Sequence, residues 1–185
     1  YTCEPPSKNG YVLRVDSGVE YPYVIDCNHK YTEYYDACGR LAKVVSHEGF
    51  ETLITYSDTL TTITDTVSGK KIYLEKDTTG KIVRVYDDAS RQATFTYNQN
   101  ILTGICDLNG NTLTYTYNDL GQVLTGTDSE GTCYFTNTYD ECGRVATQKD
   151  GVASSLESTL CYGDFISVAT NRNGKESIRE YDCNG

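Results

Sequence analysis

One pattern recurs along the chain: YDACGRL at residues 35–41, KDTTGKI at 76–82, YNDLGQV at 117–123 and YDECGRV at 139–145. Tyr-Asp-like pairs recur every 19 to 23 residues, and the chain ends on the opening of another copy, YDCNG at 181–185. A fixed period of about 20 to 50 residues is typical of repeat architectures. Residues 35–185 are therefore predicted to form one tandem array, preceded by a less regular segment at 1–34.

A second turn signal lies halfway through most units and ends in glycine. Asp or Asn at the start of a turn accepts a hydrogen bond from the backbone, and Gly supplies the positive φ that closes the turn. Two turns in about 21 residues leave two strands of about six residues, the usual strand length. The halfway signals are His47-Glu48-Gly49, Val67-Ser68-Gly69, Leu108-Asn109-Gly110, Ser129-Glu130-Gly131, Lys149-Asp150-Gly151 and Arg172-Asn173-Gly174, with Ala89-Ser90-Arg91 in the same place without glycine.

The segments between the turns alternate as β-strands do. In TLTYTY at 112–117 every second residue is Thr, and the others are Leu, Tyr and Tyr. Side chains two apart share one face of a strand, so one face is predicted to be apolar and the other hydroxylated. The sequence predicts an all-β fold of tandem β-hairpins, forming one long curled antiparallel sheet of about fourteen strands. A further hairpin is expected at 11–25, with its turn at Asp16-Ser17-Gly18.

Composition and charge limit the classes of partner. The 185 residues carry 16 Lys and Arg against 26 Asp and Glu, a formal net charge of −10. Binding to nucleic acid or to an anionic membrane requires clustered basic residues, so neither partner is expected. No run approaches the ~18 apolar residues of a spanning helix, and no signal peptide is visible. Because the chain contains no Met, we expect it to be a piece of a longer protein.

The repeated YDxxGR opening, with glycine at mid-unit, resembles the RHS/YD-repeat family, which includes bacterial polymorphic-toxin shells and teneurin-like proteins. The resemblance covers roughly residues 35–185. It implies a strip of β-hairpins that spirals into a hollow shell, which in the toxin relatives encloses a C-terminal effector. The proline-bearing segment that ends the repeats of those relatives is absent, because no Pro lies beyond residue 22. Neither self-cleavage nor an effector is therefore assigned to this chain.

The repeat residues are predicted to have structural roles. The tyrosines are expected to pack over a neighbouring hairpin and to send their hydroxyls to a partner at the rim; an exposed tyrosine platform for sugar or protein is the alternative. Arg40 and Arg144 are expected to pair with Asp36 and Asp140. The predicted repeat-motif residues are Tyr35, Asp36, Gly39, Arg40, Asp77, Gly80, Tyr97, Tyr117, Asn118, Gly121, Tyr139, Asp140, Gly143, Arg144, Tyr181 and Asp182.

The chain has eight cysteines, at positions 3, 27, 38, 106, 133, 142, 161 and 183. Bridged Cα atoms lie about 4.4–6.8 Å apart, so only residues that face each other on neighbouring strands can pair. A turn at Asp150-Gly151 would place Cys142 opposite Cys161, and this is the predicted disulfide. Cys106 is expected to face position 112 or 94, and Cys133 position 127 or 149, so both are predicted to stay reduced.

No metal, cofactor or catalytic residue is predicted. The sequence has no C-x-x-C, only two His (His29 and His47), and no calcium-loop ladder in the stretch 107–111. No nucleophile elbow, phosphate loop or dinucleotide motif is present, and the many acidic residues recur at turns. The chain is therefore not predicted to be an enzyme.

The predicted function is structural. We expect a wall segment of a large secreted or cell-surface bacterial YD-repeat protein, enclosing or displaying another domain of the same parent chain. Its partners would be the other repeats and that domain. A carbohydrate- or protein-binding adhesion module is the alternative. Exposed strand edges recruit other strands, so an isolated segment is expected to associate through its edges.

Overall fold

The computed structural model describes residues 11–27, 30–151 and 157–182. Cys3, His29 and Cys183 lie outside the described residues. The chain divides into two compact units, residues 1–93 and 94–185.

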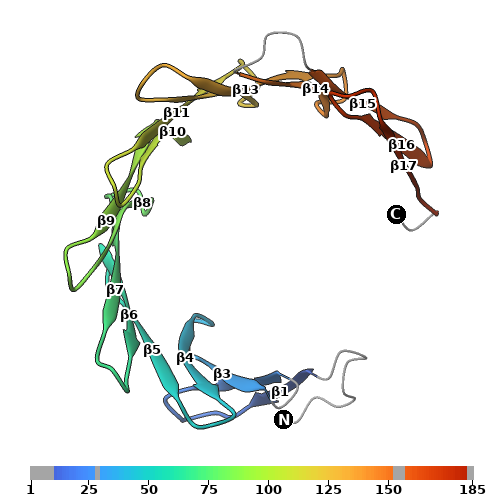
Figure 1. Cartoon of the computed structure of the whole chain (residues 1–185). Coiled ribbons are helices and arrows are strands. Elements are labelled where there is room, and N and C mark those ends of the chain that lie inside the picture. Colours follow the sequence, from blue (N-terminus) through green and yellow to red (C-terminus); the bar gives the residue numbers. More distant parts are fainter. Residues whose placement is uncertain (1–10, 28–29, 152–156, 183–185) are drawn as a thin grey trace. The chain divides into compact units, whose positions relative to one another are not determined.

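The described residues form 17 strands and no helix (Figure 1). The first unit contains β1 (Tyr11–Val15), β2 (Tyr23–Cys27), β3 (Tyr31–Tyr35), β4 (Leu41–Ser46), β5 (Glu51–Tyr56), β6 (Leu60–Asp65), β7 (Lys71–Lys76) and β8 (Ile82–Asp87). From the boundary onward follow β9 (Gln92–Asn98), β10 (Ile101–Cys106), β11 (Thr112–Tyr117), β12 (Val123–Asp128), β13 (Cys133–Tyr139), β14 (Val145–Asp150), β15 (Glu157–Tyr162), β16 (Ile166–Thr170) and β17 (Glu176–Glu180). The predicted all-β fold is confirmed, with fourteen strands after Tyr35.

Every strand pairs antiparallel with its neighbour in sequence, from β1 to β8 in the first unit. The same meander runs from β9 to β17 in the second unit. Among the described strands, the contacts within each unit join only sequence neighbours. Each unit is therefore one sheet thick, with no second layer packed on either face.

A sheet of one layer has little interior. Within residues 13–26, 30–151 and 157–182, Val24 is the only buried hydrophobic residue, at 7% exposure, and Thr61 and Asn137 are the buried polar residues. The accessible surface is 13,075 Å², whereas a compact monomer of 20.6 kDa is expected to expose about 8,900 Å². Stability must therefore come mainly from contacts between adjacent strands and turns.

The two faces of the second unit differ as the alternation predicts. On β11, Thr114 and Thr116 are exposed while Leu113, Tyr115 and Tyr117 are half-buried. Threonine hydroxyls also bond across neighbouring strands, Thr116 to Thr125 (2.6 Å) and Thr138 to Thr147 (2.8 Å). One face is thus a set of threonine hydroxyls and the other carries aromatic and aliphatic groups.

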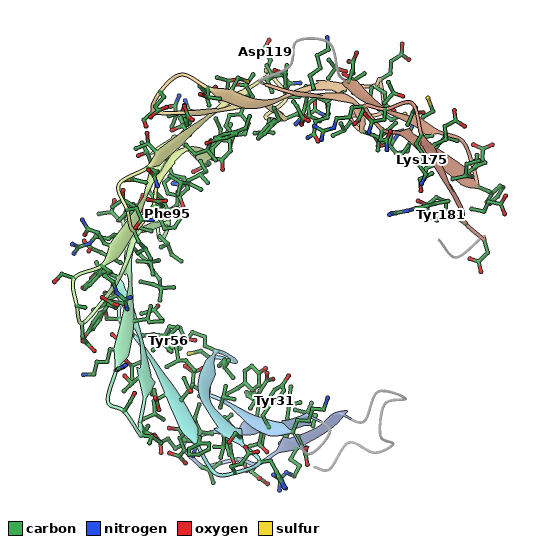
Figure 2. All side chains as sticks on the ribbon, viewed as in Figure 1. Tyr31, Tyr56, Phe95, Asp119, Lys175 and Tyr181 are labelled. Carbon is green, nitrogen blue, oxygen red and sulfur yellow. The ribbon has the colours of Figure 1, made fainter. Side chains whose placement is uncertain are left out.

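The first unit has a comparable apolar face. Ile63 of β6 lies opposite Ile54 of β5 and Ile72 of β7, and two residues beyond Ile54 is Tyr56. Figure 2 shows Tyr31 and Tyr56 projecting from the same side of this unit. The opposite face carries ion pairs, such as that between Arg84 and Glu75.

The N-terminal hairpin differs from the prediction at its second strand. The turn lies at the predicted place, with Gly18 at φ +79°, but β2 begins at Tyr23 rather than at Val19. The connection is longer because the Asp16 N–H donates to the carbonyl of Pro22 (2.8 Å). Proline has no N–H to donate to a ladder, and the strand starts immediately after it.

Candidate functional site

The Tyr-Asp turns are the features that the sequence repeats most faithfully, and Asp36 shows how they work. Its Oδ1 accepts hydrogen bonds from the backbone N–H groups of Cys38 and Arg40, both at 2.9 Å. The Asp36 N–H donates to the carbonyl of Arg40, and the Gly39 N–H donates to the carbonyl of Asp36. One aspartate therefore closes a five-residue turn, in which it is the first residue and Arg40 the fifth.

The same two side-chain bonds, from the third and fifth amides to the first residue, occur at eight turns of the described residues. The first residues are Asp36, Asp77, Asn118 and Asp140 at the Tyr-Asp positions and Asp87, Asp107, Asp128 and Asn171 at the halfway positions. The halfway turns are thus the same structure as the Tyr-Asp turns. The repeat-motif residues predicted from the sequence do not include these four, although an Asp or Asn three residues before the glycine marks three of them.

The fourth turn position requires a left-handed backbone. Gly39, Gly80, Gly121 and Gly143 have φ between +75° and +86°, a range that costs an L-residue about 1–2 kcal/mol. At the turn that lacks glycine, Ser90 takes this conformation with φ +61°. The glycines of the repeat are therefore needed for backbone conformation rather than for space.

At four Tyr-Asp positions a tyrosine hydroxyl joins the strand end to the preceding strand. Tyr139, the last residue of β13, donates to the carbonyl of Val123, the first residue of β12 (2.6 Å). The same bond runs from Tyr56 to Leu41 (2.6 Å), from Tyr162 to Val145 (3.0 Å) and from Tyr117 to Leu102. These bonds span 15 to 17 residues, so the tyrosines fix how adjacent strands align at this end.

The other predicted tyrosines lie at corresponding strand ends with different partners. Tyr35 donates to Glu33 Oε2 (2.6 Å), and the Tyr181 hydroxyl is 3.0 Å from Ser167 Oγ. Tyr97 lies opposite Leu102 in the ladder between β9 and β10. Asp182 follows Tyr181 as an exposed residue.

The predicted Arg–Asp pairs are present. Arg40 and Arg144 each donate through Nε to Oδ2 of the first turn residue, at 2.9 and 2.8 Å, and each Nη2 lies 2.8 Å from the same oxygen. Exposed pairs of this kind contribute about 0–1 kcal/mol. Each guanidinium also lies over a tyrosine ring of the next repeat, Arg40 over Tyr56 at 4.6 Å and Arg144 over Tyr162 at 4.3 Å from the centroid.

Hydrogen bonding lowers the pKa of the turn aspartates. The backbone N–H of the fifth residue is the main cause for Asp36 and Asp140, and it favours the charged carboxylate. At the halfway turns, side-chain hydrogen bonds from Arg91 and Asn111 are the main causes of the lowered pKa of Asp87 and Asp107. These carboxylates are occupied as turn acceptors.

Three Tyr-Asp positions have shorter turns. Ser57, Asn98 and Gly163 stand where the other units have a five-residue turn, and the chain reverses through two central residues. Gln99 lies in one of these turns with φ +54°, and the Gly163 N–H donates to the carbonyl of Ile166 in another (2.7 Å). The repeat therefore tolerates two turn lengths at this end of the strands.

The predicted disulfide between Cys142 and Cys161 is not present, because both are free thiols. The expected turn at Asp150-Gly151 is wrong: Asp150 is the last residue of β14 and lies opposite Phe135. β15 begins at Glu157, and its register with β14 differs from the predicted one. Thr147 lies opposite Thr159. In this register Cys161 does not lie opposite Cys142.

The other cysteine positions test the predicted register directly. Cys106 lies opposite Thr112 and Thr94, and Cys133 opposite Thr127, as predicted. The alternative for Cys133 at Lys149 is wrong, because Lys149 lies opposite Thr136. Cys38, Cys106 and Cys133 are free thiols in the structure.

No group of three or more His, Cys, Asp or Glu residues that could hold a metal ion exists within residues 11–27, 30–151 and 157–182. The same part of the chain holds no helix long and apolar enough to cross a membrane. An open depression of about 480 Å³ lies across β15, β16 and β17, and hydroxyl, amide and aliphatic groups line most of it. The arrangement at the turns supplies backbone closure and contacts between repeats.

Comparisons with known proteins agree with this architecture. The family model described as the teneurin YD-shell matches residues 19–178. No curated protein matches the chain. The crystal structure of TcdB2-TccC3 without its hypervariable C-terminal region is similar, with a TM-score of 0.58 and 16% identity over 94% of this chain and 10% of that one.

Two related crystal structures are similar to the same degree. TcdB2-TccC3-Cdc42 has a TM-score of 0.57 and 15% identity, over 93% of this chain and 9% of that one. TcdB2-TccC3-TEV has a TM-score of 0.56 and 15% identity, over 85% of this chain and 9% of that one. The chain thus spans about a tenth of the length of these solved chains, and at this identity the likeness concerns the fold alone.

Proposed function

The chain belongs to the teneurin YD-shell family, and from this premise we propose that it is a non-catalytic wall segment of a larger β-shell. The wall would enclose or display another domain of the same parent chain. The observation that carries this proposal is the single layer of strands in each unit, in which contacts join only sequence neighbours. A compact globular domain would cover at least one face of its sheet with a second layer.

The turn contacts support a wall-building role. One hairpin alone is marginally stable, and in a repeat protein stability is a sum over units and their interfaces. Tyr56 and Tyr162 reach back to the preceding hairpin through their hydroxyls, while Arg40 and Arg144 reach forward to the next tyrosine ring. Such links extend a sheet indefinitely from one repeated segment.

The proposal that the wall surrounds or presents a second domain rests on relatives of the fold. One similar structure is that of TcdB2-TccC3 without its hypervariable C-terminal region, and the present chain covers about a tenth of that chain. We infer that the remainder of this chain's parent supplies further wall and the domain it holds. Secretion or surface attachment in a bacterium is the matching location.

A non-catalytic role agrees with the use made of the acidic residues. Four of the turn aspartates, Asp36, Asp77, Asp107 and Asp140, each accept two backbone hydrogen bonds. A general acid or base needs a pKa near the working pH, whereas the pKa of each of these groups is lowered from its ordinary value. The carboxylates are thereby suited to structure rather than to proton transfer.

The test is to express the whole reading frame that encodes this chain and to image the product by electron cryomicroscopy. The expected result is a hollow β-wall that contains strands β1 to β17, with further polypeptide inside it or attached to it. A product in which these strands pack into a closed two-layer core would contradict the proposal. A glycan array with the 185-residue chain tests the adhesion alternative, which requires specific binding.

A further inference from the structure

At three Tyr-Asp turns, those that begin at Asp36, Asn118 and Asp140, the fifth residue makes contacts in two directions. Within its own turn, Arg144 pairs with Asp140. Beyond its turn, the Arg144 guanidinium lies 4.3 Å from the centroid of the Tyr162 ring, in the next repeat. Arg40 repeats both contacts, with Asp36 in its own turn and with the ring of Tyr56 at 4.6 Å.

Gln122 occupies the same fifth position with different chemistry and reaches equally far. Its Oε1 accepts from Asn118 Nδ2 (2.6 Å), which is the first residue of its own turn. Its Nε2 donates to the carbonyl of Gly143 (2.9 Å), 21 residues ahead in the next Tyr-Asp turn. An uncharged pair thus replaces the Arg–Asp pair, and the contact with the following repeat is kept.

The halfway turns provide an internal comparison. Arg91 is the fifth residue of the turn that begins at Asp87, and it donates through Nε to Asp87 Oδ2 at 2.7 Å. The structure gives Arg91 the same ion pair as Arg40 and Arg144 but no aromatic ring contact. The ring contact is therefore separate from what closes the turn.

We propose that the fifth residue of the Tyr-Asp turns that begin at Asp36, Asn118 and Asp140 is a positioning residue that couples its hairpin to the one that follows. It does so in two chemical forms, Arg over the next tyrosine ring or Gln to the next turn carbonyl. The preceding strand holds this tyrosine twice, since Tyr162 also donates to the carbonyl of Val145, the residue that follows Arg144. This inference rests on the proposed wall-building function and names the residues that set the interface between neighbouring units.

A double-mutant cycle on the full 185-residue chain tests the coupling. Arg144→Met removes the charge and keeps the aliphatic stem, and Tyr162→Leu removes the ring. Exposed cation–π contacts are modest, so the double variant is expected to shift the unfolding equilibrium about 2- to 5-fold less than the product of the single shifts. The matched control is Arg91→Met with Tyr162→Leu, which is expected to be multiplicative.

Amide hydrogen exchange gives a second measurement, because a purely local defect at the turn would not change exchange in β15. Arg144→Met is expected to speed exchange in β15, in the next repeat, as well as at its own turn. Arg91→Met is expected to leave β15 unchanged. Tyr162→Phe keeps the ring, so its coupling to Arg144 is expected to persist although the hydroxyl bond is lost; this variant serves if Tyr162→Leu does not fold.

Multiplicative effects of Arg144→Met and Tyr162→Leu, or exchange changes confined to residues 140–144, would overturn the coupling role. Neither result would affect the wall-building proposal, which depends on the image of the whole protein. Conversely, a coupled pair in a protein that forms no wall would leave the coupling in place and remove its stated purpose.

Discussion

Asn137 is buried at 6% exposure and joins three strands, so replacing it should reveal how much a single polar contact stabilises a one-layer sheet. Its Nδ2 donates to the carbonyl of Val123 on β12 (3.2 Å), and its Oδ1 accepts from Gln148 Nε2 on β14 (3.0 Å). Each such bond contributes about 0.5–1.5 kcal/mol net. Asn137→Ala is therefore expected to lower the free energy of unfolding by about 2 kcal/mol.

Urea denaturation followed by circular dichroism measures this change. With a slope of about 2 kcal/mol per molar urea, the midpoint should fall by about 1 M. Asn137→Asp separates hydrogen bonding from volume, because the carboxylate keeps the shape and loses the donor to Val123. It is expected to be at least as destabilising as Asn137→Ala at neutral pH.

Asn173→Ala is the matched control, since this exposed asparagine lies in a turn where only its backbone N–H is bonded. It is expected to change the free energy of unfolding by no more than about 0.5 kcal/mol. A loss below about 0.5 kcal/mol for Asn137→Ala, or a fully stable Asn137→Asp, would refute the claim that these two bonds hold β12, β13 and β14 together.

Three further outcomes are expected. Gly143→Ala should destabilise the folded chain by about 1–2 kcal/mol, because φ is +79° at this position. Ser90→Gly should stabilise it by about 1 kcal/mol, because Ser90 has a positive φ at the equivalent turn position. Thermal unfolding of the two variants checks the direction of each change. Gly126→Ala should cost about 1–3 kcal/mol in a urea titration, because the new Cβ would lie 2.5 Å from the Phe135 ring. The turn aspartates have a lowered pKa in the folded chain. Their contribution to stability is therefore present above the ordinary Asp pKa of about 3.9 and is lost as the pH falls through the pKa values of the folded chain. Circular dichroism from pH 7 downward should show the sheet unfolding only in strong acid, and loss of structure near pH 5 to 6 would contradict this.

The turns and the strand alternation could be predicted from the sequence because both depend on local chemistry. Asp36 and Gly39 are three residues apart, and the bonds that close their turn lie within five residues. The alternation in β11 needs only the period of two that any strand has. For the same reason Cys106 lies opposite Thr112 and Thr94, as expected from short connections.

The tertiary structure alone decided the contacts between residues far apart in the chain. The connection after Asp150 is longer than its Asp-Gly signal indicates, and this separates Cys142 from Cys161. The bond from Tyr139 to Val123 and the stacking of Arg144 on Tyr162 depend on register across two or more strands. A shift of one residue turns every side chain of a strand to the other face, so a small change in one loop alters the partners across the two strands that it joins, and only the assembled sheet determines them.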